Sequence, residues 1–295
     1  PRITSFVSIF RFITACFEVF KIFILHRPSK IISFGGYVSF PVCIVGYILF
    51  IPIFLHEQTI MPGKANTILA RFAKKIFVSF PEALNFFPRH KTMCIGNPLR
   101  ERYEVHQKPL WYPKTDKPLL LILGGSSGSH SLNLLIKPLI SELSKKYCLI
   151  HQIGDSSYGD YEDLRHQTSK SYIPTKFILP SELPYVFEKS HMVISRAGAN
   201  TFFDLIYFKK PSILIPLPWA KFKEQELQAS VLAKHGVSMV FEQSRPAHEL
   251  LSIILEIESN YSHYVTNFAK LQDVAQRIIW GKEFLDYLDN PSDLT

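Results

Sequence analysis

The sequence predicts an α/β protein whose sheets are parallel. Short apolar runs alternate with segments of helical periodicity along most of the chain, which is typical of strands joined by helices. One unit shows the pattern completely, with an apolar run at 192–194, a helix beginning at Ala199 and a second apolar run at 212–216. Two lysines and a proline at 209–211 mark the end of that helix. Strands connected through a helix in this way lie parallel in one sheet.

A polar stretch containing prolines divides the chain into two domains. We expect a first domain over residues 1–106, a linker over 107–117 and a second domain over 118–295. Each half contains its own alternation of strands and helices. A chain of 295 residues with 47% hydrophobic side chains is also long and apolar enough to form two cores.

The same periodicities place the remaining elements. Strands are expected at 29–33, 51–55, 75–79, 92–95, 118–123, 148–153 and 175–179. Helices are expected at 41–50, 64–72, 131–147, 183–190, 227–235, 247–258 and 261–279.

Two apolar segments near the N-terminus raise the question of a membrane. Residues 1–25 are rich in Phe and Ile but carry interspersed charges, which favours an amphipathic helix docked on a sheet or lying on a membrane surface over a signal peptide. Residues 37–55 carry no charge and are long enough to span a bilayer. Because Pro41, Gly46 and Pro52 divide this stretch, a buried helix followed by a buried strand is the favoured interpretation, with a transmembrane helix as the alternative.

Composition restricts the classes of partner. The net charge of +8 fits an anionic ligand or surface. Nucleic acid is not expected, because the lysines and arginines are scattered along the chain instead of being concentrated on one element. Cys16, Cys43, Cys94 and Cys148 stand far apart, which argues against a disulfide framework and a zinc site and favours a reducing compartment.

A glycine-rich loop follows the first strand of the second domain. Gly124, Gly125 and Gly128 lie between that strand and a helix, an arrangement that can hold phosphate through backbone amides. The loop also matches the G-x-S-x-G pattern of α/β-hydrolases, with Ser126 as nucleophile. In that alternative Asp204 would be the acid, followed by His235 or His248 as the base. A glycine turn without a ligand is the third possibility.

The turn after the strand at 192–194 is the second candidate site in this domain. Arg196, Gly198, Asn200 and Thr201 follow the strand, with Asp204 one helical turn later. Amides and a hydroxyl suit a phosphate, and a carboxylate suits sugar hydroxyls. The alternative is that Thr201 and Asp204 form a variant capping box and bind nothing.

The first domain carries polar residues after its central strand. His56, Glu57, Gln58 and Thr59 follow one another there. A zinc-binding H-E-x-x-H motif would need histidine at position 60, which is Ile60. Residues at the carboxyl end of a parallel strand remain candidates for a site on topology alone, and a loop that satisfies its own backbone is the alternative.

Five motifs together resemble one family. They are GGYVS (Gly35–Ser39), HEQ (His56–Gln58), GNPLR (Gly96–Arg100), GGSSGSHSLN (Gly124–Asn133) and SRAGANTFFD (Ser195–Asp204), and Gln225 follows them in the same order. The set resembles the MurG family, the transferases that add N-acetylglucosamine to the undecaprenyl-linked peptidoglycan precursor lipid I. The resemblance runs from about Phe10 to Trp280.

The resemblance implies a GT-B fold of two Rossmann-like domains, the first one incomplete. It implies inverting, metal-independent transfer from UDP-GlcNAc to lipid I without a cofactor, by a peripheral enzyme on the cytoplasmic face of the plasma membrane. The donor site would comprise Thr59, Arg100, Ser126, Ile178, Ala199, Asn200, Thr201, Asp204 and Gln225, and the acceptor side Gly35, Gly36 and Tyr37. A lipid glycosyltransferase of the diacylglycerol glucosyltransferase type is the alternative on the same fold.

The sequence departs from the family pattern in two ways. Asp204 stands where the family usually has Glu, and Thr59 stands where Asn is common. Ser127 replaces the usual Gln of the glycine loop, and Glu224 stands before Gln225 where Gln or His is common. The family also begins with a GGTGGH-like loop carrying its proposed catalytic histidine, and that loop would lie upstream of Pro1. We therefore expect a truncated or split enzyme whose catalytic base is unknown, with His56 and Glu57 as candidates for a supporting role.

Overall fold

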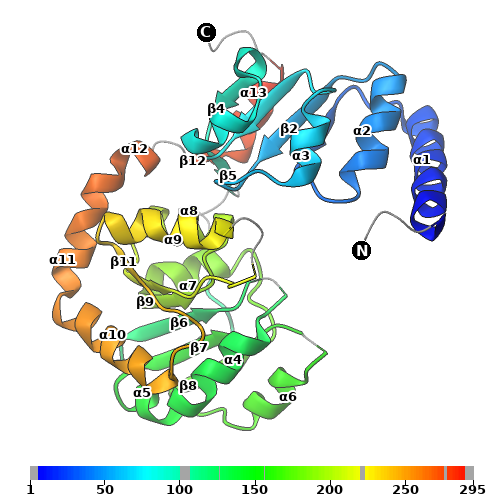
Figure 1. Cartoon of the computed structure of the whole chain (residues 1–295). Helices are drawn as coiled ribbons and strands as arrows, with labels where there is room; N and C mark the ends of the chain where they lie inside the picture. The colour runs from blue at the N-terminus through cyan, green and yellow to red at the C-terminus, as the bar shows by residue number, and fades with distance from the viewer. Residues whose placement is uncertain are drawn as a thin grey trace. The chain divides into compact units, whose positions relative to one another are not determined.

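The computed structural model describes residues 6–99, 107–125, 127–155, 157–219, 223–275 and 278–289. The chain divides into two compact units, one comprising Pro1–Pro98 and Arg277–Thr295 and the other Leu99–Gln276 (Figure 1). Both contain parallel sheets with helices on their faces, as expected for the predicted α/β class.

The first unit is built on a four-stranded parallel sheet with the order β1-β2-β3-β4. Its strands are β1 (Ile31–Ser33), β2 (Ile53–Glu57), β3 (Lys75–Val78) and β4 (Thr92–Cys94). Its helices are α1 (Phe6–His26), α2 (Ser39–Ile48), α3 (Lys64–Leu69) and the short 3-10 helices η1 (Pro81–Phe86) and η2 (Arg89–Lys91). Strands β5 (Asn97–Leu99) and β12 (Ile278–Trp280) form a separate two-stranded sheet. The C-terminal helix α13 (Gly281–Asp289) follows β12 directly.

The uncharged stretch at 37–55 forms helix α2 and the beginning of β2. Helix α2 ends at Ile48, and Phe50 then adopts a φ of 57° in the left-handed region, where the chain turns towards β2. Strand β2 lies two residues later than predicted, so it includes His56 and Glu57. No helix within the described ranges has both the length and the apolarity to cross a bilayer.

The second unit contains a six-stranded parallel sheet with the order β11-β10-β9-β6-β7-β8. The strands are β6 (Leu119–Leu123), β7 (Cys148–Gln152), β8 (Tyr172–Thr175), β9 (Ser190–Ser195), β10 (Ser212–Leu214) and β11 (Ser238–Val240). The helices are α4 (His130–Ile136), η3 (Lys137–Leu139), α5 (Ile140–Lys146), α6 (Asp160–Arg165), α7 (Leu183–Lys189), α8 (Ala199–Tyr207), α9 (Glu224–Lys234), α10 (Ala247–Ser259), α11 (Tyr261–Thr266), η5 (Asn267–Leu271) and α12 (Gln272–Ala275). The strand order reverses direction between β6 and β9, and ligands of such sheets bind beyond the carboxyl ends at that point.

Two predicted domain boundaries were wrong. The stretch at 107–117 is docked on the second unit, where Gln107 N donates to Ser181 O (3.0 Å) and the rings of Tyr112 and Tyr185 meet at 5.1 Å. The C-terminal segment groups with the first unit instead of the second. Two side chains of α13, Phe284 and Leu288, form a buried cluster there with three residues from the sheet and its loops, Phe54, Phe77 and Ile95.

Three predicted elements also differ from the structure. The strand expected at 175–179 lies at Tyr172–Thr175, where Pro174 is tolerated because β8 is an edge strand. The helix expected at 131–147 is interrupted at Lys137–Leu139, which contains Pro138. The helix expected at 261–279 is broken into several short segments, and its last residues belong to β12.

Candidate active site

The glycine loop of the second unit lies beyond β6, at the switch point of the sheet. Gly125 and Gly128 have φ values of +91° and +78°, which favour glycine. A Cβ added to Gly128 would lie 2.1 Å from the carbonyl oxygen of Ile153, so the loop packs directly on the backbone that follows β7. This contact explains Gly128 without a ligand. Ser126 lies outside the described residues, as does Arg100.

Gln152, at the end of β7, connects the glycine loop to the segment after β8. Its Nε2 donates to the carbonyl oxygen of Gly125 (2.8 Å), and its Oε1 accepts from the N–H of Ile178 (2.9 Å). The backbone N–H of Ile178 is therefore engaged, and a nucleobase at Ile178 would use the carbonyl oxygen. Gln152 was not predicted as a site residue, and its signal in the sequence is its position at the carboxyl end of a strand.

Helix α8 begins directly after β9 and carries four of the predicted donor residues. Its N-cap is Gly198, with extended backbone and no side-chain cap. Thr201 is therefore the third residue of the helix, and the alternative in which Thr201 caps it is wrong. Ala199 and Thr201 are half-buried and Asn200 is exposed, whereas Asp204 is buried one turn further along.

Arg196 lies at the end of β9 with its guanidinium buried. Its Nε and Nη2 donate to Ser129 Oγ (3.0 and 2.7 Å), and its Nη1 donates to the carbonyl oxygen of Ile215 (2.9 Å). Nη2 also lies 2.7 Å from Ser131 Oγ and 2.6 Å from Gln243 Oε1. Burial lowers the pKa of Arg196 to about 10, so the group is still a cation at neutral pH.

Helix α9 is fixed to the same edge of the sheet by two glutamines. Gln225 Oε1 accepts from the N–H of Leu217 (3.1 Å), in the loop after β10. Gln228 is buried, and its Nε2 donates to the carbonyl oxygen of Ala197 (3.1 Å), in the turn before α8. Gln225 was predicted as a sugar contact, whereas Gln228 was not among the predicted site residues.

His56 in the first unit is not placed as a solvent-accessible base. It is fully buried, its Nε2 donates to the carbonyl oxygen of Gly96 (2.9 Å), and its ring lies edge-on to those of Phe34 and Phe284 at 5.5 and 5.3 Å. Burial lowers the pKa of His56 to about 4. The imidazole is therefore neutral at physiological pH and serves the packing of the sheet edge.

Glu57 organises the turn that carries Thr59. Its Oε1 accepts from the N–H and the hydroxyl of Thr59 (3.0 and 2.7 Å). Its Oε2 accepts from the N–H of Gly63 (3.0 Å) and from Asn66 Nδ2 (2.9 Å). A buried carboxylate with four donors is a positioning group, and these contacts assign it no proton-transfer role.

The predicted acceptor segment lies beyond β1 on the same edge of that sheet. Gly35 and Gly36 have φ values of +88° and +86°. A Cβ on Gly35 would lie 3.1 Å from the side-chain amide of Asn66, so this loop packs on the helix that Glu57 also contacts. Tyr37 is exposed. Over the described ranges, no cluster of three or more His, Cys, Asp or Glu side chains could hold a metal ion.

Comparisons with known proteins agree with this architecture. The family model described as "Glycosyltransferase family 28 C-terminal domain" matches residues 119–278, and the one described as "Glycosyltransferase family 28 N-terminal domain" matches residues 4–78. Among solved structures, the fold of this chain is similar to that of MurG from Acinetobacter baumannii, with a TM-score of 0.65 and 22% identity over 98% of this chain and 83% of that one. It is also similar to UDP-GlcNAc 2-epimerase from Neisseria meningitidis bound to UDP-GlcNAc, with a TM-score of 0.67 and 12% identity over 98% and 83% of the two chains.

Curated relatives are more similar in sequence. A protein of Clostridium novyi named UDP-N-acetylglucosamine–N-acetylmuramyl-(pentapeptide) pyrophosphoryl-undecaprenol N-acetylglucosamine transferase is 35% identical over 90% of this chain and 75% of its own length. A protein of the same name from Treponema pallidum is 33% identical over 86% and 70%. These matches, together with the two Rossmann-like units and their parallel sheets, confirm the GT-B fold and the predicted resemblance: the chain belongs to glycosyltransferase family 28 and, within it, to the MurG family.

Proposed function

We propose that this protein transfers N-acetylglucosamine from UDP-GlcNAc to the undecaprenyl-linked precursor lipid I, giving lipid II for peptidoglycan synthesis. The observation that carries the proposal is the conjunction of family membership with two polar loops at one switch point of the second unit's sheet. The glycine loop after β6 and the turn after β9 follow adjacent parallel strands. Such a crevice suits a nucleotide diphosphate.

The donor is assigned to the second unit. The nine-residue helix α8 offers its first-turn amides, at Ala199 to Thr201, to the diphosphate. Asp204 is placed one turn later for the ribose hydroxyls, and Gln225 for the sugar. As the glycosidic bond to UDP breaks, negative charge grows on the diphosphate, and the amides together with the buried cation of Arg196 stabilise it. The transfer needs no metal or cofactor in this proposal.

Asp204 provides the test of donor binding. Replacing Asp204 with Ala should weaken the binding of UDP and of UDP-GlcNAc by about 1–3 kcal/mol, because the ribose hydroxyls would lose a buried acceptor. Titration calorimetry measures the affinity, and Asp204→Asn, which keeps the shape, separates charge from volume. Melting temperatures of both variants give the structural effect. If Asp204→Ala lowered only the melting temperature while UDP bound as before, Asp204 would not contact the nucleotide.

Transfer assays distinguish the competing activities. Any sugar transfer should use UDP-GlcNAc and a soluble lipid I analogue, also in the presence of EDTA, and should not use UDP-glucose and diacylglycerol. The opposite preference would favour the diacylglycerol glucosyltransferase alternative. The hydrolase alternative requires Ser126 to react with a fluorophosphonate probe, and labelling of Ser126 would contradict the transferase assignment.

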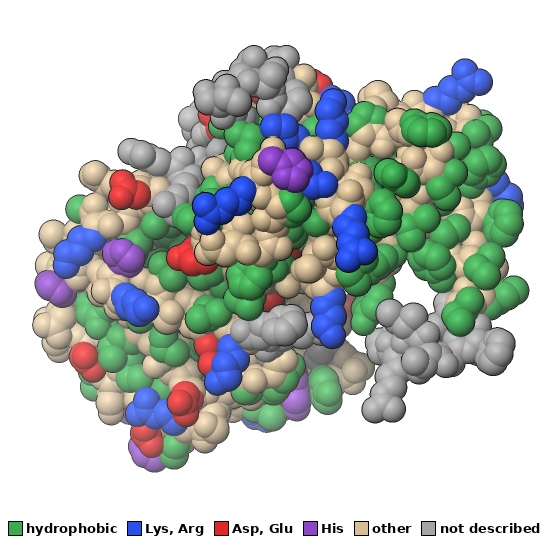
Figure 2. Space-filling view, turned by 45° about the horizontal axis from the view of Figure 1, so that its top comes forward, with side chains coloured by type: hydrophobic (Ala, Val, Ile, Leu, Met, Phe, Trp, Pro, Cys, Tyr) green, Lys and Arg blue, Asp and Glu red, His purple; other side chains and the backbone are tan. Residues whose placement is uncertain are grey.

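Helix α1 is the surface that we assign to a membrane. Between residues 9 and 26, where side-chain burial is described, the half-buried positions of α1 are Ala15, Cys16, Val19 and Phe23, a narrow stripe that faces the rest of the first unit. Over the same described part of α1, the exposed large apolar side chains are Ile9, Phe10, Phe12, Ile13, Phe17, Phe20, Ile22, Ile24 and Leu25. Figure 2 shows hydrophobic side chains gathered over α1 and α2. A monomer rarely leaves an apolar surface of this extent to water.

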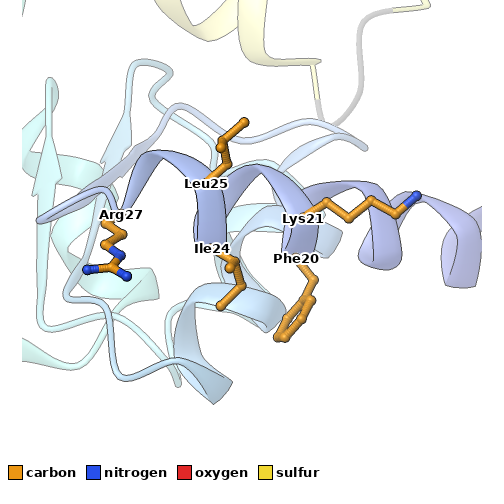
Figure 3. Close-up of a pocket in the computed structure, with 5 residues that line it drawn as sticks. All are labelled: Phe20, Lys21, Ile24, Leu25 and Arg27. Atoms are coloured by element: carbon orange, nitrogen blue, oxygen red, sulfur yellow. The ribbon is translucent and has the colours of Figure 1, made fainter.

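Basic groups adjoin this apolar face. A shallow pocket at the end of α1 is lined by Phe20, Ile24 and Leu25 together with Lys21 and Arg27 (Figure 3). Apolar side chains flanked by cations suit a bilayer with anionic headgroups. We therefore propose peripheral attachment through α1, on the membrane face where the nucleotide sugar is available, the cytoplasmic one.

Vesicle binding tests this surface. Phe17→Ser and Ile24→Ser should each reduce sedimentation with vesicles containing phosphatidylglycerol by roughly tenfold, because burying one such side chain contributes about 1.5–3 kcal/mol. Raising the salt concentration should weaken binding further. Leu255→Ser is the matched control, because Leu255 is 57% exposed on α10 of the second unit and Ile24 is 54% exposed. Equal losses in all three variants would contradict attachment through α1.

A further inference from the structure

Arg196 is a buried cation whose partners are all neutral. It is 4% exposed, and its guanidinium contacts two serine hydroxyls, one side-chain amide oxygen and one backbone carbonyl oxygen. The described part of the chain contributes no carboxylate to it. Burying a charge without a counter-ion is unfavourable, so an anion bound nearby would recover part of the lost stabilisation.

Ser129 carries the consequence of this arrangement to the surface. A hydroxyl has two acceptor positions and one hydrogen to donate. Ser129 Oγ accepts from both Nε and Nη2 of Arg196, so its acceptor positions are filled. No acceptor for its own hydrogen exists among the described residues, although Ser129 is only half-buried. The guanidinium thus directs the hydrogen of Ser129 away from itself, as a donor available to a ligand.

Ser131 contacts the same guanidinium but has no hydrogen to spare. Its Oγ accepts from Nη2 of Arg196 (2.7 Å) and donates to Gln243 Oε1 (2.9 Å). The two serines therefore share a partner and differ in one property, which is whether their hydroxyl can donate to a ligand.

Ser129 also stands where the diphosphate is expected. It is the last residue of the glycine loop and the N-cap residue of α4, yet it makes no side-chain cap. Arg196 is attached to the same strands, since its N–H donates to the carbonyl oxygen of Leu123 (3.3 Å), the last residue of β6. The pair is thus located at the β6–β9 switch point.

We propose that Ser129 donates its hydroxyl hydrogen to the diphosphate of the nucleotide sugar and that Arg196 is the positioning residue that orients this hydroxyl and supplies the positive charge behind it. This inference rests on the proposed function, because it takes UDP as the ligand. It adds a phosphate contact to those that the family resemblance implies. Neither residue is assigned a contact with the nucleoside part of the ligand.

Binding of UDP and of uridine to the full chain tests the proposal. Ser129→Ala should reduce the affinity for UDP by roughly tenfold or more, which is the effect of losing a hydrogen bond to a charged group. It should leave uridine affinity within a factor of about two. Ser131→Ala is the matched control and should bind both ligands as the parent chain does. Arg196→Gln should reduce UDP affinity at least as much as Ser129→Ala.

The outcomes separate this inference from the proposed function. A loss of UDP affinity in Ser129→Ala with uridine unchanged supports it, since a merely structural defect would weaken both ligands. Equal behaviour of the two serine variants overturns the role of Ser129 while leaving the UDP site in place. If the parent chain did not bind UDP, both the proposed function and this inference would fail.

Discussion

Gly128→Ala should destabilise the second unit by about 2–5 kcal/mol, the sum of overpacking and backbone strain. The new Cβ would stand 2.1 Å from the carbonyl oxygen of Ile153 and 2.6 Å from the Cα of Gly154, and both are backbone atoms that cannot rotate away. The φ of +78° adds the strain of an alanine in the left-handed region, about 1–2 kcal/mol. Denaturant unfolding followed by circular dichroism measures the loss. UDP affinity should fall as well, because the loop must shift.

Gly125→Ala separates the two contributions to this effect. Gly125 has a similar φ of +91°, but a Cβ there would meet nothing within 4 Å. Its substitution should therefore cost only the backbone strain of about 1–2 kcal/mol. If both variants lost the same stability, the close approach of Gly128 to the backbone of Ile153 and Gly154 would not contribute to the effect.

Glu57→Gln should destabilise the first unit by about 2–4 kcal/mol, because buried donors would be left unpaired. The carboxylate faces four donors, two at each oxygen, and the Thr59 hydroxyl among them also lies 2.6 Å from the carbonyl oxygen of Met61. A glutamine amide would present an NH₂ group to two of these donors and leave them unpaired in a buried site. Thr59 and Gly63 would lose their common partner, so the turn that carries the predicted donor residue Thr59 should loosen.

Thermal unfolding and transfer assays measure this effect together. Glu82→Gln is the control, because Glu82 is an exposed carboxylate in η1 of the same unit, and its loss should leave stability within about 0.5 kcal/mol. Full stability of Glu57→Gln would show that the contacts of this carboxylate do not organise the turn.

Sequence patterns predicted the strand–loop–helix units best, because those signals are local. The apolar run at 119–123 followed by glycines, and the helix beginning at Ala199, both lie where periodicity placed them. Strand β8 was misplaced because the apolar residues at 177–179 resemble a strand. The actual strand, Tyr172–Thr175, contains a proline and is defined by its pairing with β7.

The candidate site was predictable where motifs occur and not where side chains cross between segments. The role of Gln152 depends on contacts with Gly125 and Ile178, each 26 or 27 residues away. Four acceptors surround Arg196, and two of them, Ser129 and Ser131, precede it by 67 and 65 residues. Local periodicity carries no information about such pairs. Long-range packing also decided that α13 belongs to the first unit.

That packing has a consequence for how the chain is made. Phe284 and Leu288 of α13 complete the cluster around Phe54 and Phe77, although the whole second unit is encoded between them. During synthesis, all residues of the second unit are therefore made before the first unit has received the last part of its core. During that interval Phe54, Phe77 and His56 lack their contacts with α13. The unit that is begun first is therefore completed last. Nascent-chain protease protection should appear in that order.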